Sequence, residues 1–234
     1  MIACYHLHVE WKGERKPLFQ DISFEIPKGS FVQCTGPSGS GKSVLFSFLS
    51  LRCIPKQGQL IIGGRNLARL SRLKIPGLRR RMGACAQRPD FLEDRTVQEN
   101  LLLPFVARGA SKDAPDAVAS LLEAFDLGAV ADVPMHILSA QERRMAAIAR
   151  ACAGHPETIL IDGGVEALDE SHQRRALAAL RQAHAQGSTI VLWSRKPARV
   201  MGIDSIDMRL ERGTLRLVER PRLTPSPEHY APRR

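Results

Sequence analysis

The sequence predicts an α/β fold with a parallel core sheet, an antiparallel β flank and a helical subdomain. A glycine-rich loop stands between an apolar, β-prone run at 31–35 and a helix that opens at Val44. Strand, helix and strand alternate again over 158–193, which is the pattern of a parallel sheet. Near the start of the chain, residues 2–9 and 18–26 predict two strands that form an antiparallel pair.

The glycine-rich loop fills every position of the pattern GxxxxGKS, which binds phosphate groups when it joins a strand to a helix. It consists of Gly36, Pro37, Ser38, Gly39, Ser40, Gly41, Lys42 and Ser43. Its glycines let several amide N–H groups point inward, and the start of the helix adds partial positive charge. We expect Lys42 to reach the β- and γ-phosphates and the Ser43 hydroxyl to bind Mg²⁺. The alternative, a Gly/Ser-rich turn that binds nothing, is disfavoured by the full pattern in this context.

The composition describes a folded and basic protein. The 234 residues are 44% hydrophobic, which suits one large α/β domain or two small ones. The net charge of +10 predicts an anionic partner, but nucleic acid, a phosphate ligand and a membrane surface all satisfy it. No apolar run approaches the ~20 residues that span a bilayer, and no signal peptide is expected. Any membrane role is therefore expected to depend on a partner.

The cysteines do not indicate a metal site. They are Cys4, Cys34, Cys53, Cys85 and Cys152. Because they form neither a CxxC pair nor a metal-ligand spacing, we expect buried, reduced thiols.

The remaining elements continue the α/β pattern. The sequence predicts helices from about Thr96 and at 113–130, 139–153 and 169–185, strands at 82–86, 158–161 and 189–193, and a hairpin of 206–210 and 214–218. We expect one domain over 1–218, with a core at 1–90 and 155–218 and a helical insert at about 91–154. Residues 219–234 hold four prolines and four arginines, which predicts a disordered basic tail.

The order of these features resembles that of ABC-type ATPase subunits over nearly all of 1–218. The features are the phosphate loop, Gln87, the helix capped by Ser139 and the strands that end at Asp162 and Trp193. Within this family, residues 91–100 with the downstream Leu103-Pro104 are most similar to the bacterial cell-division subunit FtsE. Lipoprotein-release and macrolide-efflux ATPases are close relatives.

The resemblance implies ATP and Mg²⁺ as cofactors. At matching positions, Trp11 takes the place of the aromatic that stacks on adenine, and Gln87 that of the metal- and water-sensing glutamine. Asp162 takes the place of the carboxylate associated with Mg²⁺, so that Ser43, Gln87 and Asp162 are expected around the metal. On spacing alone, Trp11 is explained as well by a ring that only covers the sheet.

The signature motif departs from the family pattern. The family reads LSGGQ or LSGGE, whereas this chain has Leu138, Ser139, Ala140, Gln141 and Glu142. In the family this segment contacts the nucleotide held by a second chain. Glycine allows a close approach that an added Cβ restricts. Because Ser139 is kept, we expect a weakened contact with the partner's nucleotide rather than none.

Two catalytic positions are also replaced, so no catalytic residue of the family is intact. Gly163 stands where the family has the glutamate that polarises the attacking water, and Arg195 stands at the switch histidine. Glu166 is a substitute candidate, disfavoured because its carboxylate has to reach back across a turn. Arg195 is either a fixed charge on the γ-phosphate or a surface residue at a drifted position. Loss of a positioned base costs ~10²–10⁴ in rate.

The resemblance therefore implies an FtsE-like ATP-binding subunit on the cytoplasmic face of the inner membrane. Its partners are an FtsX-like transmembrane subunit and a second ATP-binding subunit, with a homodimer favoured, and hydrolysis is expected to be weak. The alternative is a fully active ABC transporter ATPase of the lipoprotein-release or efflux type. A nucleic-acid-associated ABC protein suits the charge, but such proteins usually carry two cassettes in one chain, so nucleic acid is not the expected partner.

Overall fold

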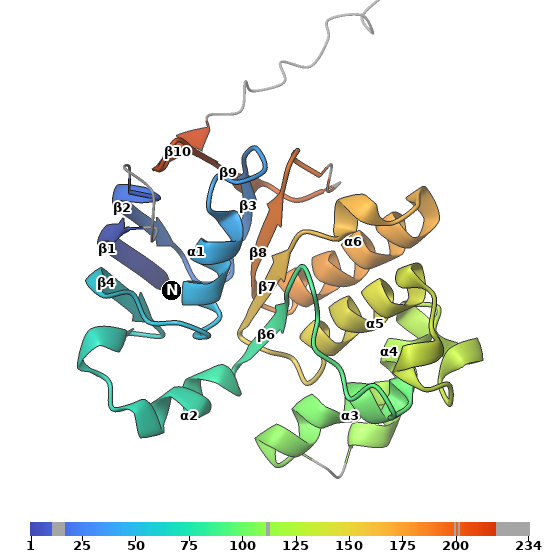
Figure 1. The fold of residues 1–234 in the computed structure, drawn as a ribbon. Coiled ribbons are helices and arrows are strands. Elements are labelled where there is room, and N and C mark those ends of the chain that lie inside the picture. Colours follow the sequence, from blue (N-terminus) through green and yellow to red (C-terminus); the bar gives the residue numbers. More distant parts are fainter. Residues whose placement is uncertain (11–16, 111–112, 199, 201, 219–234) are drawn as a thin grey trace, which may run out of the picture.

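Two β-sheets carry the fold in the computed structural model, which describes residues 1–10, 17–110, 113–198, 200 and 202–218 (Figure 1). The strands are β1 (Ile2–Val9), β2 (Phe19–Ile26), β3 (Phe31–Thr35), β4 (Gln57–Ile62), β5 (Arg65–Asn66), β6 (Met82–Cys85), β7 (Thr158–Asp162), β8 (Thr189–Ser194), β9 (Ser205–Glu211) and β10 (Thr214–Val218). The larger sheet has the order β10-β9-β3-β8-β7-β6, and the smaller one β2-β1-β4-β5. All neighbours in the larger sheet are parallel except the β9-β10 hairpin, whereas the smaller sheet is antiparallel throughout. The predicted parallel core and antiparallel flank are both confirmed.

The helices lie on both sides of the larger sheet, where α1, α5 and α6 contact its strands and α3 packs on α5. They are α1 (Lys42–Leu49), α2 (Ile75–Arg79), α3 (Val97–Arg108), α4 (Ala114–Ala124), α5 (Ala140–Cys152) and α6 (Glu170–Ala185). Figure 1 shows α1 between the two sheets, with α3 to α6 gathered on the opposite side of the larger one. Alternate residues of each central strand face opposite sides. In β8, for example, Val191 and Trp193 join the apolar cluster around α1, while Ile190 and Leu192 join the cluster under α5 and α6.

The sheet order brings three strand ends together. Thr35 at the end of β3 pairs with Ser194 of β8, and Trp193 pairs with Asp162 at the end of β7. In parallel sheets, ligands bind at the carboxyl ends of the strands. The three loops that follow β3, β7 and β8 therefore meet at one edge of the sheet.

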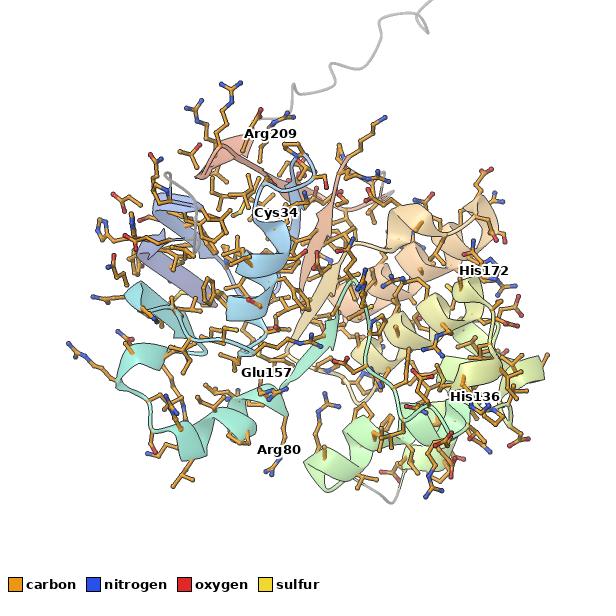
Figure 2. All side chains as sticks on the ribbon, in the orientation of Figure 1. Cys34, Arg80, His136, Glu157, His172 and Arg209 are labelled. Atoms are coloured by element: carbon orange, nitrogen blue, oxygen red, sulfur yellow. The ribbon has the colours of Figure 1, made fainter. Side chains whose placement is uncertain are left out.

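Two expectations need correction. The helix predicted at 113–130 ends at Ala124, because Asp126 adopts a left-handed conformation with φ 57°, and only a short 3₁₀ turn follows at Gly128–Val130. Cys53 is exposed, although Cys4, Cys34 and Cys85 are buried. Cys34 lies beside α1 in the interior (Figure 2).

Among the described residues, no helix combines the length and the apolar character needed to cross a bilayer. Helices α3, α4 and α5 lie between β6 and β7 in the chain, where the helical insert was predicted. The division into a core and an insert stays a prediction, and the predicted tail at 219–234 lies outside the described residues.

Candidate nucleotide-binding site

The glycine-rich loop connects the buried strand β3 to α1. Gly41 caps the helix in a left-handed conformation with φ 96°, and a Cβ built on it would lie 2.5 Å from Cε1 of Phe19. Neither the backbone nor the space at this position suits a larger residue. The amide groups at the start of α1 therefore remain open toward the loop, as a phosphate cradle requires.

The side chain of Lys42 folds over this loop. Its Nζ donates hydrogen bonds to the carbonyl oxygens of Gly36 and Pro37, both at 2.7 Å. Burial lowers the pKa of Lys42, and the nearby carboxylates of Asp162 and Glu166 oppose that shift. The loop itself thus holds the ammonium group of Lys42, which lines the cavity described below.

Asp162 ends β7 and faces the start of α1. Its side chain is buried, with 5% of the residue exposed. Burial raises the pKa of Asp162, while the Ser43 hydroxyl and the positive charges of Lys42 and Arg144 act against this. A hydroxyl and a carboxylate are hard oxygen donors, so Ser43 and Asp162 fit Mg²⁺, which takes few protein ligands and keeps several waters.

One cavity of about 620 Å³ unites most of the predicted residues. Its walls include Ser38, Gly39, Gly41, Lys42, Ser43, Gln87, Asp162, Gly163 and Arg195 from the predicted set. The remaining predicted loop residues, Gly36, Pro37 and Ser40, belong to the same loop but do not line the cavity. Trp11 lies outside the described residues. The cavity also contains two charged residues with no predicted binding role, Arg144 and Glu166.

The loop after Asp162 explains why Glu166 reaches the cavity. Gly163 and Gly164 both have left-handed backbones, with φ 67° and 88°, so the chain turns sharply into a 3₁₀ turn at Val165–Ala167. Glu166 then accepts hydrogen bonds from the backbone N–H of Arg195 at 2.9 Å and from its Nε at 3.2 Å. Glu166 therefore lines the cavity despite the turn, and whether it can replace the missing base stays a prediction.

Arg144 on α5 was not anticipated from the sequence. It donates to the carbonyl oxygens of Ala86 at 3.0 Å and Gln87 at 2.6 Å. Its side chain also covers Gly164, where a Cβ would lie 2.6 Å from the arginine Nε. This single side chain therefore joins the signature helix, the Gln87 loop and the turn after Asp162.

Two further arginines of α5 hold the same loop. Arg143 and Arg150, two helical turns apart and thus on one face, both lie over the Phe91 ring, at 5.4 Å and 4.4 Å from its centre. Arg143 also forms a two-pronged ion pair with Glu93, and Arg150 donates to the Asp90 carbonyl oxygen. The i, i+7 spacing of these arginines is the sequence signal that could have revealed this packing.

The signature segment lies away from this cavity. Ser139 is exposed and caps α5: its Oγ accepts from the Glu142 N–H at 3.3 Å and donates to Glu142 Oε2 at 2.6 Å. Ala140 is exposed, and the buried Oε1 of Gln141 has no hydrogen-bond partner among the described residues. The serine hydroxyl is therefore engaged within its own helix start, and none of residues 138–142 lines the cavity.

The fold and the cavity define a phosphate-loop nucleotide-binding protein: a glycine loop between a parallel strand and a helix, with a lysine and a buried carboxylate beside it. Residues 19–165 match the family model of the ABC transporter ATP-binding domain. The chain belongs to this family, and its α/β architecture is that of an ABC-type P-loop NTPase.

Curated relatives share about a third of the sequence. The chain is 34% identical over 197 residues to the methionine import ATP-binding protein MetN 1 of Burkholderia pseudomallei, which covers 82% of this chain and 57% of that protein. It is 34% identical over 200 residues to MetN of Photobacterium profundum, covering 84% and 58%. The chain thus spans little more than half the length of these relatives. These relatives are methionine-import proteins, so the resemblance of residues 91–100, Leu103 and Pro104 to FtsE stays a prediction.

Solved structures support the fold independently. The dimeric, post-hydrolysis form of the ATP-binding cassette MJ0796 with ADP and Pi superimposes with a TM-score of 0.84 at 23% identity, covering 94% of this chain and 98% of that one. A second dimeric structure of MJ0796 gives 0.83 at 23% identity, over 92% and 96% of the two chains. At this identity the likeness establishes the architecture.

Proposed function

We propose that this chain is the ATP-binding subunit of a membrane ABC complex, that Mg-ATP closes it as a dimer, and that it hydrolyses ATP slowly. The observation that carries the proposal is the contrast within one cavity. The phosphate loop, Lys42, Ser43 and Asp162 are all present in it, whereas Gly163 brings no carboxylate to the position that follows Asp162.

Nucleotide binding rests on the first group of residues. The loop amides and Lys42 would neutralise the phosphates, and Ser43, Asp162 and Gln87, which line the same cavity, would hold Mg²⁺. When bound, Mg²⁺ offsets the negative charge of the β- and γ-phosphates. Trp11 is the proposed stacking partner of adenine, whose loss would weaken ATP and ADP binding alike by ~1–3 kcal/mol.

Slow hydrolysis follows from the second group. Phosphoryl transfer depends on positioning and charge more than on covalent chemistry of the protein, and loss of a positioned base costs ~10²–10⁴ in rate. Arg195, at the switch position, has no acceptor nitrogen. The altered signature adds to this, because Ala140 and Gln141 bring Cβ atoms to a surface that the family keeps as glycine.

A homodimer is the proposed assembly. In that case each of the two composite sites carries every replacement at once, and neither has an intact counterpart. Pairing with an intact ATPase chain would divide the faults between the two sites, because Gly163 and Arg195 affect the site on this chain's phosphate loop while Ala140 and Gln141 affect the other.

The type of transmembrane partner distinguishes an FtsE-like subunit from an importer subunit. The resemblance of residues 91–100 to FtsE favours an FtsX-like transmembrane subunit, on which this chain would sit at the cytoplasmic face of the inner membrane. The methionine-import relatives favour an importer transmembrane subunit as the partner instead. We keep the FtsE-like, peripheral subunit as the finer proposal. Co-purification of the chain with each type of transmembrane subunit distinguishes the two, since docking on the importer subunit alone would contradict it.

A fully active ATPase of the transporter type is the second candidate function. It is favoured by one observation: the Glu166 carboxylate lies in the cavity with Lys42 and Ser43, where it could position water. Nucleic acid remains the least favoured partner, and a salt-dependent shift with DNA or RNA would be needed to support it.

The test measures dimerisation and turnover together. Light scattering with and without Mg-ATP should show a dimer only with the nucleotide, and phosphate release should be far below the common enzyme range of ~1–10³ s⁻¹. The combined Gly163→Glu, Arg195→His, Ala140→Gly, Gln141→Gly protein should release phosphate faster than wild type. Wild-type turnover within the common range would establish the active ATPase instead.

A further inference from the structure

The ion pair between Glu166 and Arg195 occupies the open side of the cavity. The carboxylate takes two hydrogen bonds from Arg195, one from its backbone N–H and one from its Nε. The Arg195 side chain is 71% exposed and that of Glu166 27%. A guanidinium has five N–H donors, and apart from Nε those of Arg195 have no partner among the described residues. The arginine is therefore held at one edge and remains able to bind an anion.

The pair lies close to the place for the terminal phosphate. Lys42, which the phosphate loop directs at the β- and γ-phosphates, lines the same cavity as Glu166 and Arg195. Burial lowers the pKa of Lys42 most, Glu166 raises it and Arg195 lowers it, so both charges act on the ammonium group. A γ-phosphate bound beside Lys42 would therefore also experience the charges of Glu166 and Arg195.

Charge favours an exchange of partners when ATP binds. A phosphate group carries more negative charge than a carboxylate and accepts two parallel hydrogen bonds from a guanidinium. An ion pair near solvent contributes little on its own, and the arginine of this pair is largely exposed while Glu166 is half-buried. The γ-phosphate can therefore displace Glu166 from Arg195, whereas ADP ends at the β-phosphate, which the loop and Lys42 already serve.

We infer that Glu166 and Arg195 form a γ-phosphate switch: Glu166 holds Arg195 when no nucleotide or ADP is bound, and ATP draws the guanidinium onto its terminal phosphate. This inference rests on the proposed ATP binding. Arg195 is then the residue that makes the site prefer ATP over ADP, and Glu166 is the competing anion that lowers the affinity for ATP. The double-glycine turn at Gly163 and Gly164 is what allows Glu166 to stand there.

Isothermal titration with Mg-ATP and Mg-ADP tests the switch in wild type, Arg195→Ala, Glu166→Gln and the double variant. Arg195→Ala should lower the affinity for Mg-ATP about tenfold, which corresponds to the loss of one charge-assisted hydrogen bond. Glu166 is then left facing the γ-phosphate without its arginine. Glu166→Gln should raise the affinity for Mg-ATP a few-fold, which is roughly the contribution of an ion pair near solvent. The double variant should lie between them, and ADP should bind equally to all four proteins.

The control is a matched pair outside the cavity. Arg209 and Glu211 on β9 form an exposed pair at 2.9 Å, and Arg209 lies at the outer end of the molecule beside β10 (Figure 2). Arg209→Ala should leave the ratio of ATP to ADP affinity unchanged. Equal ADP affinities also show that the variants are folded.

Three results would overturn the switch. If wild type binds Mg-ATP but the ATP to ADP ratio of Arg195→Ala equals that of wild type, the switch is wrong while the proposed ATP binding stands. If Glu166→Gln weakens ATP as much as Arg195→Ala does, Glu166 supports the nucleotide and does not compete with it. Failure of wild type to bind Mg-ATP would overturn the proposed function together with the switch.

Discussion

The two sides of the nucleotide cavity are built differently. The phosphate side consists of a loop held between β3 and α1, a lysine bonded to that loop and a buried aspartate at the end of β7. The opposite side, called the open side below, consists of the left-handed turn at Gly163 and Gly164 and the ion pair of Glu166 with Arg195. The arginine side chain of this pair is largely exposed. The proposed ATP binding thus rests on residues fixed to the core of the sheet, whereas the proposed loss of hydrolysis rests on a loop and an ion pair at the edge of the cavity.

The difference also has a thermodynamic side. Residues such as Leu45, Leu49 and Leu160 are buried in the apolar cluster around α1, next to the phosphate side, and removing one large apolar side chain from such a core costs ~2–5 kcal/mol. Arg195 and Glu166 pair near solvent, where an ion pair contributes ~0–1 kcal/mol. Substitutions on the open side should therefore change the free energy of unfolding little. Substitutions in the core beneath the phosphate side should reduce both stability and nucleotide binding.

Removing the lysine should break the phosphate side with the largest effect. Lys42→Ala should reduce Mg-ATP affinity at least ~100-fold, because charge-assisted hydrogen bonds are worth ~1.5–3 kcal/mol each and Lys42 would make more than one. The fold should persist, since the hydrogen bonds of the Lys42 ammonium group to described residues all go to its own loop. Isothermal titration measures this, with the exposed Lys28→Ala as the control. Equal affinities of wild type and Lys42→Ala would refute the assignment of the loop.

Restoring the carboxylate sharpens the account of the open side. Gly163→Glu should raise phosphate release by less than the ~10²–10⁴ that a positioned base supplies, because Arg195 and the signature remain altered. A Cβ at Gly163 meets no atom within 4 Å, but its backbone has φ 67°, which costs a non-glycine residue ~1–2 kcal/mol. The melting temperature should therefore fall.

Gly163→Ala is the matched control for that experiment. It carries the same backbone strain without a carboxylate, so it should show the lower melting temperature and no gain in phosphate release. If Gly163→Glu alone releases phosphate as fast as the combined four-residue variant, the missing carboxylate is the only defect, and the interpretation of the signature and of Arg195 is wrong.

Neutralising the aspartate separates binding from stability. Burial raises the pKa of Asp162 above its ordinary 3.8, so its charged form opposes folding, and the stability that protonation gives is lost as the pH rises through the folded-state pKa. Asp162→Asn should therefore melt at a higher temperature than wild type at neutral pH, and the difference should shrink toward pH 4. Its Mg²⁺-dependent ATP affinity should fall.

Asp169, the N-cap of α6, has a pKa shifted in the opposite direction from that of Asp162, so we expect the opposite change in melting temperature. The His172 N–H bond lowers the pKa of Asp169 to about 2, so this carboxylate stabilises the fold at neutral pH and loses that effect as the pH falls through its folded pKa. Asp169→Asn should melt at a lower temperature than wild type at pH 7. Melting curves from pH 4 to pH 8 that move both variants in the same direction would contradict this account.

The smallest expected effect concerns the connection between the two sides. Arg144→Gln should leave ATP affinity nearly unchanged but speed hydrogen exchange at residues 86–93, because it removes hydrogen bonds of ~1.5–3 kcal/mol from the Gln87 loop. Arg174→Gln on α6 is the control, since that side chain is 74% exposed. Unchanged exchange in Arg144→Gln would show that Arg143, Arg150 and Phe91 hold the loop without it.

Much of the fold was accessible from the sequence because it rests on local patterns. Apolar strand runs, the capped starts of α3 and α5 at Thr96 and Ser139, and the eight-residue glycine loop each specify their structure within a few residues. The end of α4 was missed, because an aspartate can adopt a left-handed backbone without any signal as strong as glycine.

The sequence by itself determined the phosphate side, since Gly36 to Ser43 are consecutive and a strand, a loop and a helix suffice to form the cradle. It also led to the interpretation that Gly163 and Arg195 stand at two catalytic positions of the family, which stays a prediction. Only the tertiary structure decided where Glu166 and Arg144 lie. Glu166 meets Arg195 through parallel pairing of β7 with β8, and Arg144 meets Gln87 through packing of α5 on the sheet. Contacts between residues 29 and 57 positions apart depend on the packing of whole elements, which no local pattern encodes.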